Sequence, residues 1–251
     1  TDYAFQGYVI KGTSTAFDKS QYTDTSDVTV TAQWKSTIAN YKIKYHKENT
    51  SGSYVEDTSM AETKSGTIGQ ITGVTTEYAT AKLPSSGIYK LRTSNSIVNA
   101  TIAEDGTAVA NVYFELITVT YTYNASGGTW SGTETGIRSG KYGTTFTPPV
   151  PTRTNYEFKG FKDGSGDAFN KTTFDTTSNE TAYAQWESTI ASYKIEYYKE
   201  DAAGEYQIDS GLTQTLSGTI GQSTGVTSTS VASIVNNQTG YKLRDSNAIT
   251  N

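Results

Sequence analysis

The sequence predicts a β-rich chain, with an α+β class as the alternative, built from small modules in tandem. Three observations lead to this prediction. A long string near Trp34 recurs with few changes near Trp186, 152 residues later. The hydrophobic share is only 34%, and much of it is Tyr and β-branched residues, which suit half-buried strands. No window has the apolar periodicity of a long amphipathic helix.

The repeated string is also a junction between modules. It reads QWKSTIANYKIKYHK from residue 33 and QWESTIASYKIEYYK from residue 185. Each copy carries the end of one module (Ala-Gln-Trp), a short polar link, and the first strand of the next module (Tyr-Lys-Ile). A match this long at a fixed offset indicates an array, here of two alternating kinds of module.

The repeat divides the chain into four modules. The first kind occurs as a half-module at 1–36 and as a complete module at 118–188. The second kind occurs as a complete module at 41–116 and at 193–251, where the closing strand is lacking. The half-module lacks the front half equivalent to 117–153, so we expect it to be mobile or completed from outside. The two absences together correspond to one stretch equivalent to about residues 100–153, so we interpret the sequence as two periods of a longer repeat with one stretch left out. If neighbouring molecules complete each other by strand addition, copies of the chain are expected to associate end to end.

Local patterns predict the elements of the complete modules. Residues 41–45 alternate as in a strand, and three of the chain's four prolines, in 148–151, predict an extended, weakly paired segment. The 41–116 module is predicted to continue with a strand or strand–helix mixture at 54–62, a bend at 65–69, a short helix within 74–82, a strand at 88–91, a hairpin turn at 104–106 and a closing strand at 108–116. The 118–188 module is predicted to contain strands at 119–123, 156–161 and 181–186 and a turn at 163–166.

Composition excludes several classes of function. The net charge of −5 comes without a basic stripe, which argues against nucleic acid as a partner. No apolar run approaches 18 residues, and no polybasic segment adjoins an amphipathic face, so no membrane insertion is predicted. The chain has no cysteine, so its stability must come from sheets, packing between neighbours, or another crosslink. Without a signal peptide or sorting motif, the sequence is expected to be an interior segment of a longer protein.

Two motifs resemble catalytic or metal-binding features, and each has a simpler interpretation. His46 is the only histidine, and its counterpart in the second copy is Tyr198, so a surface or edge histidine is favoured over a catalytic one. Asp163–Asp167 resembles a calcium loop, but its counterparts Lys11 and Thr15 favour a tight turn. The sequence therefore predicts no catalytic residue, no metal ligand and no cofactor, and the chain is not expected to be an enzyme.

The remaining polar and aromatic motifs also favour structural roles. The segment Ser65–Gly69 has glycines but lacks the Lys-Ser/Thr of a phosphate loop. Most aromatic residues alternate with polar ones, so core packing is favoured over a sugar-stacking platform. A Lys–Asn or Thr–Gln crosslink stays open, since these residues are too numerous for the sequence to locate one. Asn-x-Ser/Thr sequons, expected by chance in a Thr-rich chain, occur at Asn49, Asn99, Asn124, Asn170, Asn179 and Asn237.

The first kind of module resembles a known bacterial repeat. Its motifs are VTYTYNASGG from residue 119, YGTTF from 142, PVPTRT from 149, FKGF from 158 and the closing Ala184-Gln-Trp186. These resemble the Listeria–Bacteroides repeat, also called the internalin B-repeat, over 118–188 and the half-module 1–36. Ser126 departs from the usual Asn or Gly, and Phe161 from the common Trp.

The second kind of module is similar to the mucin-binding-protein type of repeat. The similarity rests on YKIKY from residue 41, SGTIG from 65, GIYKL from 87 and the ending IAEDGTAVANVYF from 102. Both resemblances imply small β-grasp-like domains in tandem on bacterial surface proteins. They place the chain outside the cell, secreted or attached to the cell wall.

Two functions of different classes follow. The near-identical links, residues 36–40 and 187–192, are only about four to six residues long, which limits hinge freedom and favours an elongated, semi-rigid rod. The first expectation is therefore a structural stalk, or adhesin segment, whose partners are neighbouring repeats. The alternative is that the modules themselves bind host mucin, glycan or a surface protein, which requires an exposed aromatic or apolar patch in each copy.

Overall fold

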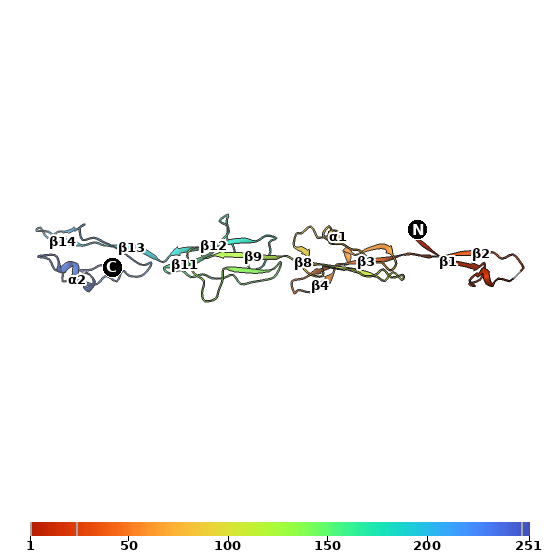
Figure 1. The fold of residues 1–251 in the computed structure, drawn as a ribbon. Coiled ribbons are helices and arrows are strands. Elements are labelled where there is room, and N and C mark those ends of the chain that lie inside the picture. The colour runs from red at the N-terminus through yellow and green to blue at the C-terminus, as the bar shows by residue number, and fades with distance from the viewer. Residues whose placement is uncertain (1, 24, 247) are drawn as a thin grey trace. The chain divides into compact units, whose positions relative to one another are not determined.

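A computed structural model describes residues 2–23, 25–246 and 248–251 (Figure 1). Strands hold 41% of the residues and helices 8%, which confirms the β-rich class. The chain forms two compact units, whose bounds differ from those of the predicted modules, since residues 118–188 are divided between both units. We keep the module ranges as names of segments only. One unit contains Thr1–Thr120, Ser139–Phe146 and Thr172–Asn179, and the other contains Tyr121–Arg138, Thr147–Lys171 and Glu180–Asn251.

The half-module 1–36 forms an antiparallel hairpin of β1 (Tyr3–Ile10) and β2 (Val30–Ser36). The register shifts between Phe5 and Gly7, and Gly7 has φ 115°, a value that suits glycine at a bulge. A short 3₁₀ helix, η1 (Lys19–Gln21), lies in the connection, and Asp18 caps it through the Ser20 N–H.

The 41–116 module is a six-stranded sheet around two parallel central strands, β3 and β8. Strands β4 and β5 pair antiparallel with β3, and β6 and β7 pair antiparallel with β8. The strands are β3 (Ile38–Glu48), β4 (Tyr54–Glu56), β5 (Glu62–Thr67), β6 (Tyr89–Leu91), β7 (Ile97–Val98) and β8 (Val109–Leu116).

The core of this module follows the alternation of its central strands. Ile43 and Tyr45 of β3 are buried, as are Val112 and Phe114 of β8, because successive side chains of a strand point to opposite faces. The short helix α1 (Thr76–Thr80) begins where the Thr75 side chain accepts from the Tyr78 N–H, and it buries Ala79 against this face. A 3₁₀ turn, η2 (Thr58–Met60), joins β4 to β5.

The 118–188 module has a four-stranded sheet in the order β10-β9-β12-β11. Its first and last strands, β9 and β12, pair in parallel, as β3 and β8 do, and β11 pairs antiparallel with β12. The aromatic core includes the edge-to-face pair of Tyr123 and Phe161, with ring centroids 4.7 Å apart. The strands are β9 (Thr118–Asn124), β10 (Ile137–Lys141), β11 (Tyr156–Lys162) and β12 (Glu180–Ser188).

The 193–251 module repeats the part of the 41–116 sheet in which β3 pairs with β4 and β5. Its β13 pairs with β16, and β14 with β15, in the registers of β3–β5 and β3–β4 shifted by 152 residues. Thr227 and Ser230 form a capping box at the helix start. The elements are β13 (Ile190–Ile195), β14 (Tyr198–Glu200), β15 (Tyr206–Ile208), β16 (Gln214–Thr219) and α2 (Ser228–Asn236).

Most predicted elements of the complete modules are confirmed, including the short helix within 74–82 and the mixed strand–helix segment at 54–62. Two local predictions were confirmed only in part. Residues 65–67 continue β5, because they pair with the start of β3, and the chain turns only at 68–69. The turn at 104–106 is present, but it lies within a long connection between the antiparallel strands β7 and β8 and closes no tight hairpin. Strands β7 and β10 were not predicted.

Candidate functional site

Three junctions connect the modules, and each consists of a single residue. Thr37 lies between β2 and β3, Ile117 between β8 and β9, and Thr189 between β12 and β13. All three residues are half-buried. The predicted polar links at 36–40 and 187–192 were therefore too long, because residues beside each junction pair into the strands on either side.

The threonine junctions use both backbone groups. The Thr37 N–H donates to the Asp2 carbonyl on the hairpin side at 2.9 Å, and the Thr37 carbonyl accepts from the Ile68 N–H of the following module at 2.9 Å. Thr189 repeats this arrangement with Asn155 and Ile220, again at 2.9 Å for both bonds. The peptide group at each junction is thus bonded to the modules on both sides, which restricts rotation there.

The Ser side chain before each threonine adds a second constraint. Ser36 Oγ donates to the Ile38 carbonyl at 2.7 Å and accepts from the Ile38 N–H at 3.2 Å. Ser188 makes the same pair of bonds across Thr189 to Ile190, at 2.8 and 3.2 Å. The shared Trp-Lys/Glu-Ser-Thr-Ile string therefore encodes a repeated joint geometry.

The Ile117 junction follows the same backbone rule with different residues. Its N–H donates to the Ile88 carbonyl at 3.0 Å, and its carbonyl accepts from the Tyr142 N–H at 3.0 Å. Here an ionic cluster accompanies the backbone bonds. Lys141 of β10 places Nζ 2.9 Å from the Leu116 carbonyl and 3.2 Å from Glu48 Oε2.

Lys141 lies beside two glutamates of the 41–116 module, Glu48 and Glu115. Both side chains are only 11% exposed. Glu48 Oε2 also accepts the Leu116 N–H at 2.8 Å, and Glu115 Oε1 accepts from Thr93 Oγ1 at 2.7 Å and pairs with Lys90 at 2.9 Å. Burial alone raises the pKa of Glu115, but the bonds from Thr93 and Lys90 outweigh it, and the pKa is lowered. The cluster therefore keeps Glu115 charged near neutral pH.

A second charged cluster stabilises the opposite part of the 41–116 module. Glu62 accepts from the hydroxyls of Tyr45 and Tyr78, both at 2.7 Å, and pairs with Lys82 at 2.9 Å and Lys64 at 3.3 Å. Burial acts to raise the pKa of Glu62, but these four donors lower it to about 2. The carboxylate is saturated with donors, which suits a structural role better than proton transfer.

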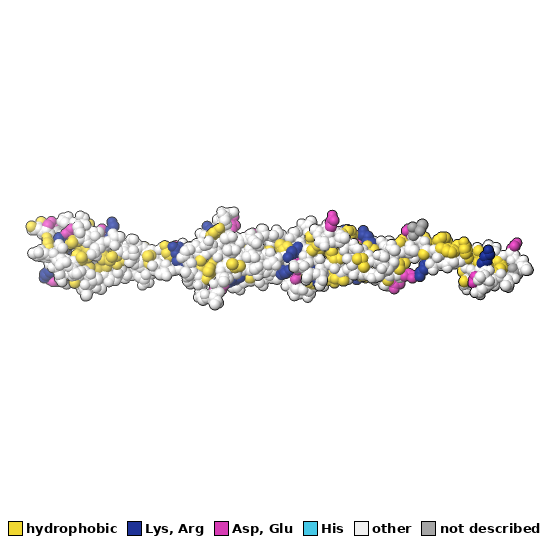
Figure 2. Space-filling view, viewed as in Figure 1, with side chains coloured by type: hydrophobic (Ala, Val, Ile, Leu, Met, Phe, Trp, Pro, Cys, Tyr) yellow, Lys and Arg dark blue, Asp and Glu magenta, His cyan; other side chains and the backbone are white. Residues whose placement is uncertain are grey.

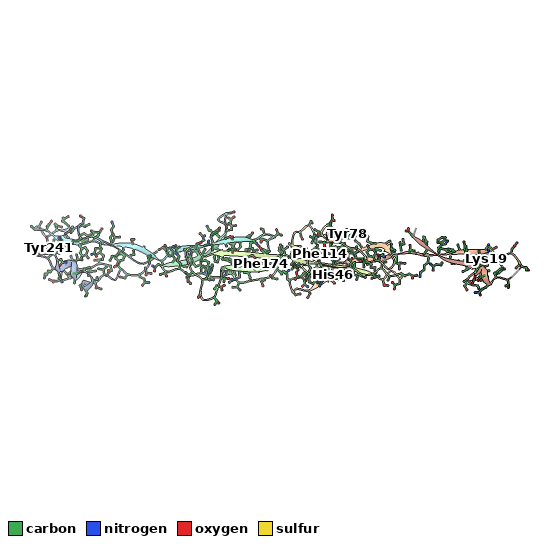
Figure 3. The ribbon with its side chains drawn as sticks, viewed as in Figure 1. Lys19, His46, Tyr78, Phe114, Phe174 and Tyr241 are labelled. Atoms are coloured by element: carbon green, nitrogen blue, oxygen red, sulfur yellow. The ribbon has the colours of Figure 1, made fainter. Side chains whose placement is uncertain are left out.

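His46, labelled in Figure 3, lies on the inner strand β3. Its Nε2 lies 2.9 Å from Asn111 Oδ1, and its ring stacks on Tyr113 with centroids 4.7 Å apart. It is half-buried, and β3 pairs with both β4 and β8 at this residue, so of the predicted surface and edge positions the edge is ruled out. Its contacts are those of a residue that packs across the sheet.

The Asp163–Asp167 segment is a tight turn, as expected. Asp163 Oδ1 accepts from the N–H groups of Ser165 at 2.9 Å and Asp167 at 3.0 Å, as in an Asx turn. Its carboxylate is thereby directed at the turn's own backbone. Among the residues that the structure describes, no group of three or more acidic or histidine side chains could hold a metal ion.

Exposed aromatic rings gather on the half-module 1–36 (Figure 2). Phe5 contacts both Tyr8 and Trp34, and Trp34 is 61% exposed. In the complete module Trp186 is half-buried instead, and its Nε1 donates to the Ala125 carbonyl at 2.9 Å. The patch therefore does not recur in the complete copy.

Several of the predicted Asn sequons have structural roles. Asn49 Oδ1 accepts from the N–H groups of Ser51 and Ser53, and Asn124 Oδ1 accepts from the Ser126 N–H at 2.8 Å. Asn99 bonds both backbone groups of Val74, at 2.8 and 3.0 Å. These hydrogen bonds give the three asparagines a structural role that does not require glycosylation.

Comparison with known proteins does not add a family. No protein-family model matches the chain, and no curated protein matches its sequence. In the described part of the chain, no helix is both long and apolar enough to cross a membrane.

The sequence predicted where the junctions lie but not how short they are. The matching Ser-Thr-Ile in both copies of the repeated string marks two of these positions. The role of Lys141 had no comparable signal, because Glu48 and Glu115 lie in another module.

Proposed function

We propose that the chain is a stalk segment of a repetitive bacterial cell-surface protein, built from β-grasp-like modules in a rod that projects or spaces a binding tip. Its partners in this role are neighbouring repeats of the same chain, and its location is extracellular, secreted or attached to the cell wall. The supporting observation is the single-residue junction, whose N–H and carbonyl bond to opposite modules at Thr37, Ile117 and Thr189. A protein whose modules act independently has no need for such coupling.

The test measures flexibility at one junction. The chain has no cysteine, so spin labels can be introduced at the exposed sites Glu77 and Ser165 without other changes. We expect a narrow distance distribution, and a markedly broader one after Gly-Ser-Gly-Ser is inserted behind Ile117. Small-angle scattering of both proteins should give an extended particle that becomes more compact on average with the insertion. A broad distribution in the parent chain would refute the stalk.

The second candidate is direct binding of host mucin, glycan or a surface protein. The observation in its favour is the exposed aromatic cluster of Phe5, Tyr8 and Trp34, since sugar rings stack on aromatic faces. It ranks second because the matching rings in the complete module pack onto their own domain. A mucin and glycan binding screen distinguishes the two, with Trp34→Ala as the variant that must abolish any binding by this cluster.

A further inference from the structure

The 193–251 module contains a groove of about 1120 Å³ between β13, β14 and the segment after α2. It exceeds the roughly 300–1,000 Å³ that is usual for small-molecule sites. Its apolar lining includes Ile195, Tyr197, Val226, Val231, Leu243 and Ile249. A smaller hollow of about 330 Å³ lies beside it, between residues 191–193 and 217–224.

The 41–116 module shows what occupies the equivalent space. Shifted back by 152 residues, the six apolar lining residues are Ile43, Tyr45, Val74, Ala79, Leu91 and Ile97, which belong to or pack on the buried core. There β8 covers them, and its Ala110, Val112 and Phe114 have no exposed surface. Figure 3 marks Phe114 in this module and Tyr241 in the other.

The smaller hollow corresponds to the seat of one side chain. In the 41–116 module Ile102 packs so closely on Gly66 that a Cβ there would lie 2.5 Å from Ile102 Cδ1. Backbone bonds at 2.8 and 2.9 Å, to Gln70 and from Gly69, hold Ile102 in this place. The counterpart of Gly66 is Gly218, and it lines the hollow. The two hollows together thus trace the path of residues 102–116.

Among the described residues, the backbone along the groove is paired on only one side. In the first copy β3 bonds to β8 from Lys42, opposite Val109, to Lys47, opposite Phe114. Among the described residues, the counterparts at 194–199 have no strand on that edge, and they split into β13 and β14 where β3 is continuous. An open edge of this kind can accept an added strand.

Charged groups at the end of the groove match the same occupant. Glu48, which accepts the Leu116 N–H, has its counterpart in Glu200. Lys90, which pairs with Glu115 at 2.9 Å, has its counterpart in Lys242. Both counterparts line the groove, so the groups that receive the end of β8 are present in the second copy.

We propose that this groove binds an extended peptide strand with the pattern of residues 102–116, parallel to β13 and β14. Its isoleucine fills the hollow at Gly218, and its small, β-branched and aromatic residues take the positions of Ala110, Val112 and Phe114. The occupant is an unpaired strand of this kind. The β8 of a second folded copy is not available, because it is bonded on both edges and buried in its own sheet.

The test titrates the 251-residue chain with a fluorescein-labelled synthetic peptide of residues 101–117. We expect saturable one-to-one binding by fluorescence anisotropy, and hydrogen-exchange protection of the amides at 194–199 on adding the peptide. The 41–116 module should gain no protection, because its slot is filled. Absence of saturable binding, or protection confined to other segments, overturns the proposal. Dimerisation of the chain through residues 194–199 would also overturn it, since a folded copy would then be the occupant.

Peptide variants test the buried positions without changing the protein. A peptide with Val112→Asp or Phe114→Asp should bind about a hundredfold more weakly, as expected for a large apolar side chain lost from a core. Equal binding of these peptides would show that the contact is not the one proposed.

A protein variant tests the hollow itself. Gly218→Ala adds a Cβ where the peptide isoleucine must sit, so binding should weaken by about tenfold or more. The Ile102→Ala peptide should bind this variant and the parent equally. Gly164→Ala, at an exposed glycine whose added Cβ would meet nothing within 4 Å, is the matched control and should leave binding unchanged. Weaker binding to both variants would count against the proposal.

Discussion

Lys141 lies 3.2 Å from Glu48, a residue of the preceding module that is far away in the sequence. The same ammonium group reaches the Leu116 carbonyl at 2.9 Å, one residue before the junction at Ile117. The contact thus joins β10 to the end of the 41–116 segment within one compact unit, and it gives two nearly buried carboxylates a counter-charge.

The Lys141→Met variant should loosen this junction. It leaves Glu48 and Glu115 without the ammonium group, although Lys90 still pairs with Glu115, so we expect a loss of about 1–3 kcal/mol. The measurement is the free energy of opening from hydrogen exchange of amides in β8 and β9.

The control is Lys159→Met, because Lys159 pairs with the exposed Glu157 and Glu187. Its effect should stay within about 0.5 kcal/mol. Equal effects of the two substitutions would show that the Lys141 cluster stabilises the junction no more than an exposed ion pair does.

Glu62 should make the 41–116 module sensitive to acid. Its pKa is lowered to about 2 in the folded chain, against an ordinary value of 4.5. A lowered pKa stabilises the fold fully above the ordinary value, and this stability is lost as the pH falls from about 4.5 toward 2. With a side chain only 21% exposed, the contribution is on the order of 3 kcal/mol.

The Glu62→Gln variant isolates this contribution. Unfolding free energies of the parent and the variant should converge as the pH falls from 4.5 to 2, and should differ by a constant amount above pH 5. A difference that is independent of pH would mean that the carboxylate charge does not matter.

Gly128 should tolerate no side chain. A Cβ there would lie 2.5 Å from Trp186 Cζ2 and 2.8 Å from the Thr152 carbonyl, and backbone atoms do not move aside easily. Gly128→Ala should destabilise the 118–188 module by about 1–3 kcal/mol, measured by thermal unfolding. Gly164→Ala, with open space around its Cβ, should change stability little, and equal losses at both sites would contradict the packing described here.

The two junction tryptophans should respond differently to the same change. Trp186→Phe removes the donor to the Ala125 carbonyl and should cost about 1–2 kcal/mol. Trp34→Phe removes an exposed ring edge and should cost less than about 0.5 kcal/mol. The measurement is denaturant unfolding of each single variant. Equal costs would contradict the different environments of the repeated string.

The strands that the sequence predicted are those with a period of two. Tyr41, Ile43 and Tyr45 alternate because β3 has one face in the core. Strand β10 escaped prediction because Ile137-Arg-Ser-Gly-Lys has a single large apolar residue, and that residue is exposed. Its pairing with β9 is a tertiary effect that no local pattern records.

The junctions also show that local sequence does not determine strand formation. Ser-Thr-Ile-Ala has the composition of a link, but pairing with β1, β5, β11 and β16 draws its residues into strands. Composition measures local preference, and pairing with strands distant in the sequence overrides it at these positions. The ionic cluster at Lys141 could not be predicted, because Lys141 and Glu48 lie far apart in the sequence and meet only in the folded chain.

Strands β3 and β8 begin and end their module, and they lie side by side in parallel, as β9 and β12 do in theirs. Tension applied through the junctions therefore pulls the two strands of each pair in opposite directions along their length. All the bonds of a ladder are then sheared at once instead of being opened one by one. In the 193–251 module, no described strand lies parallel beside β13 and β14, so among the described residues this sheared pairing belongs to the 41–116 and 118–188 modules.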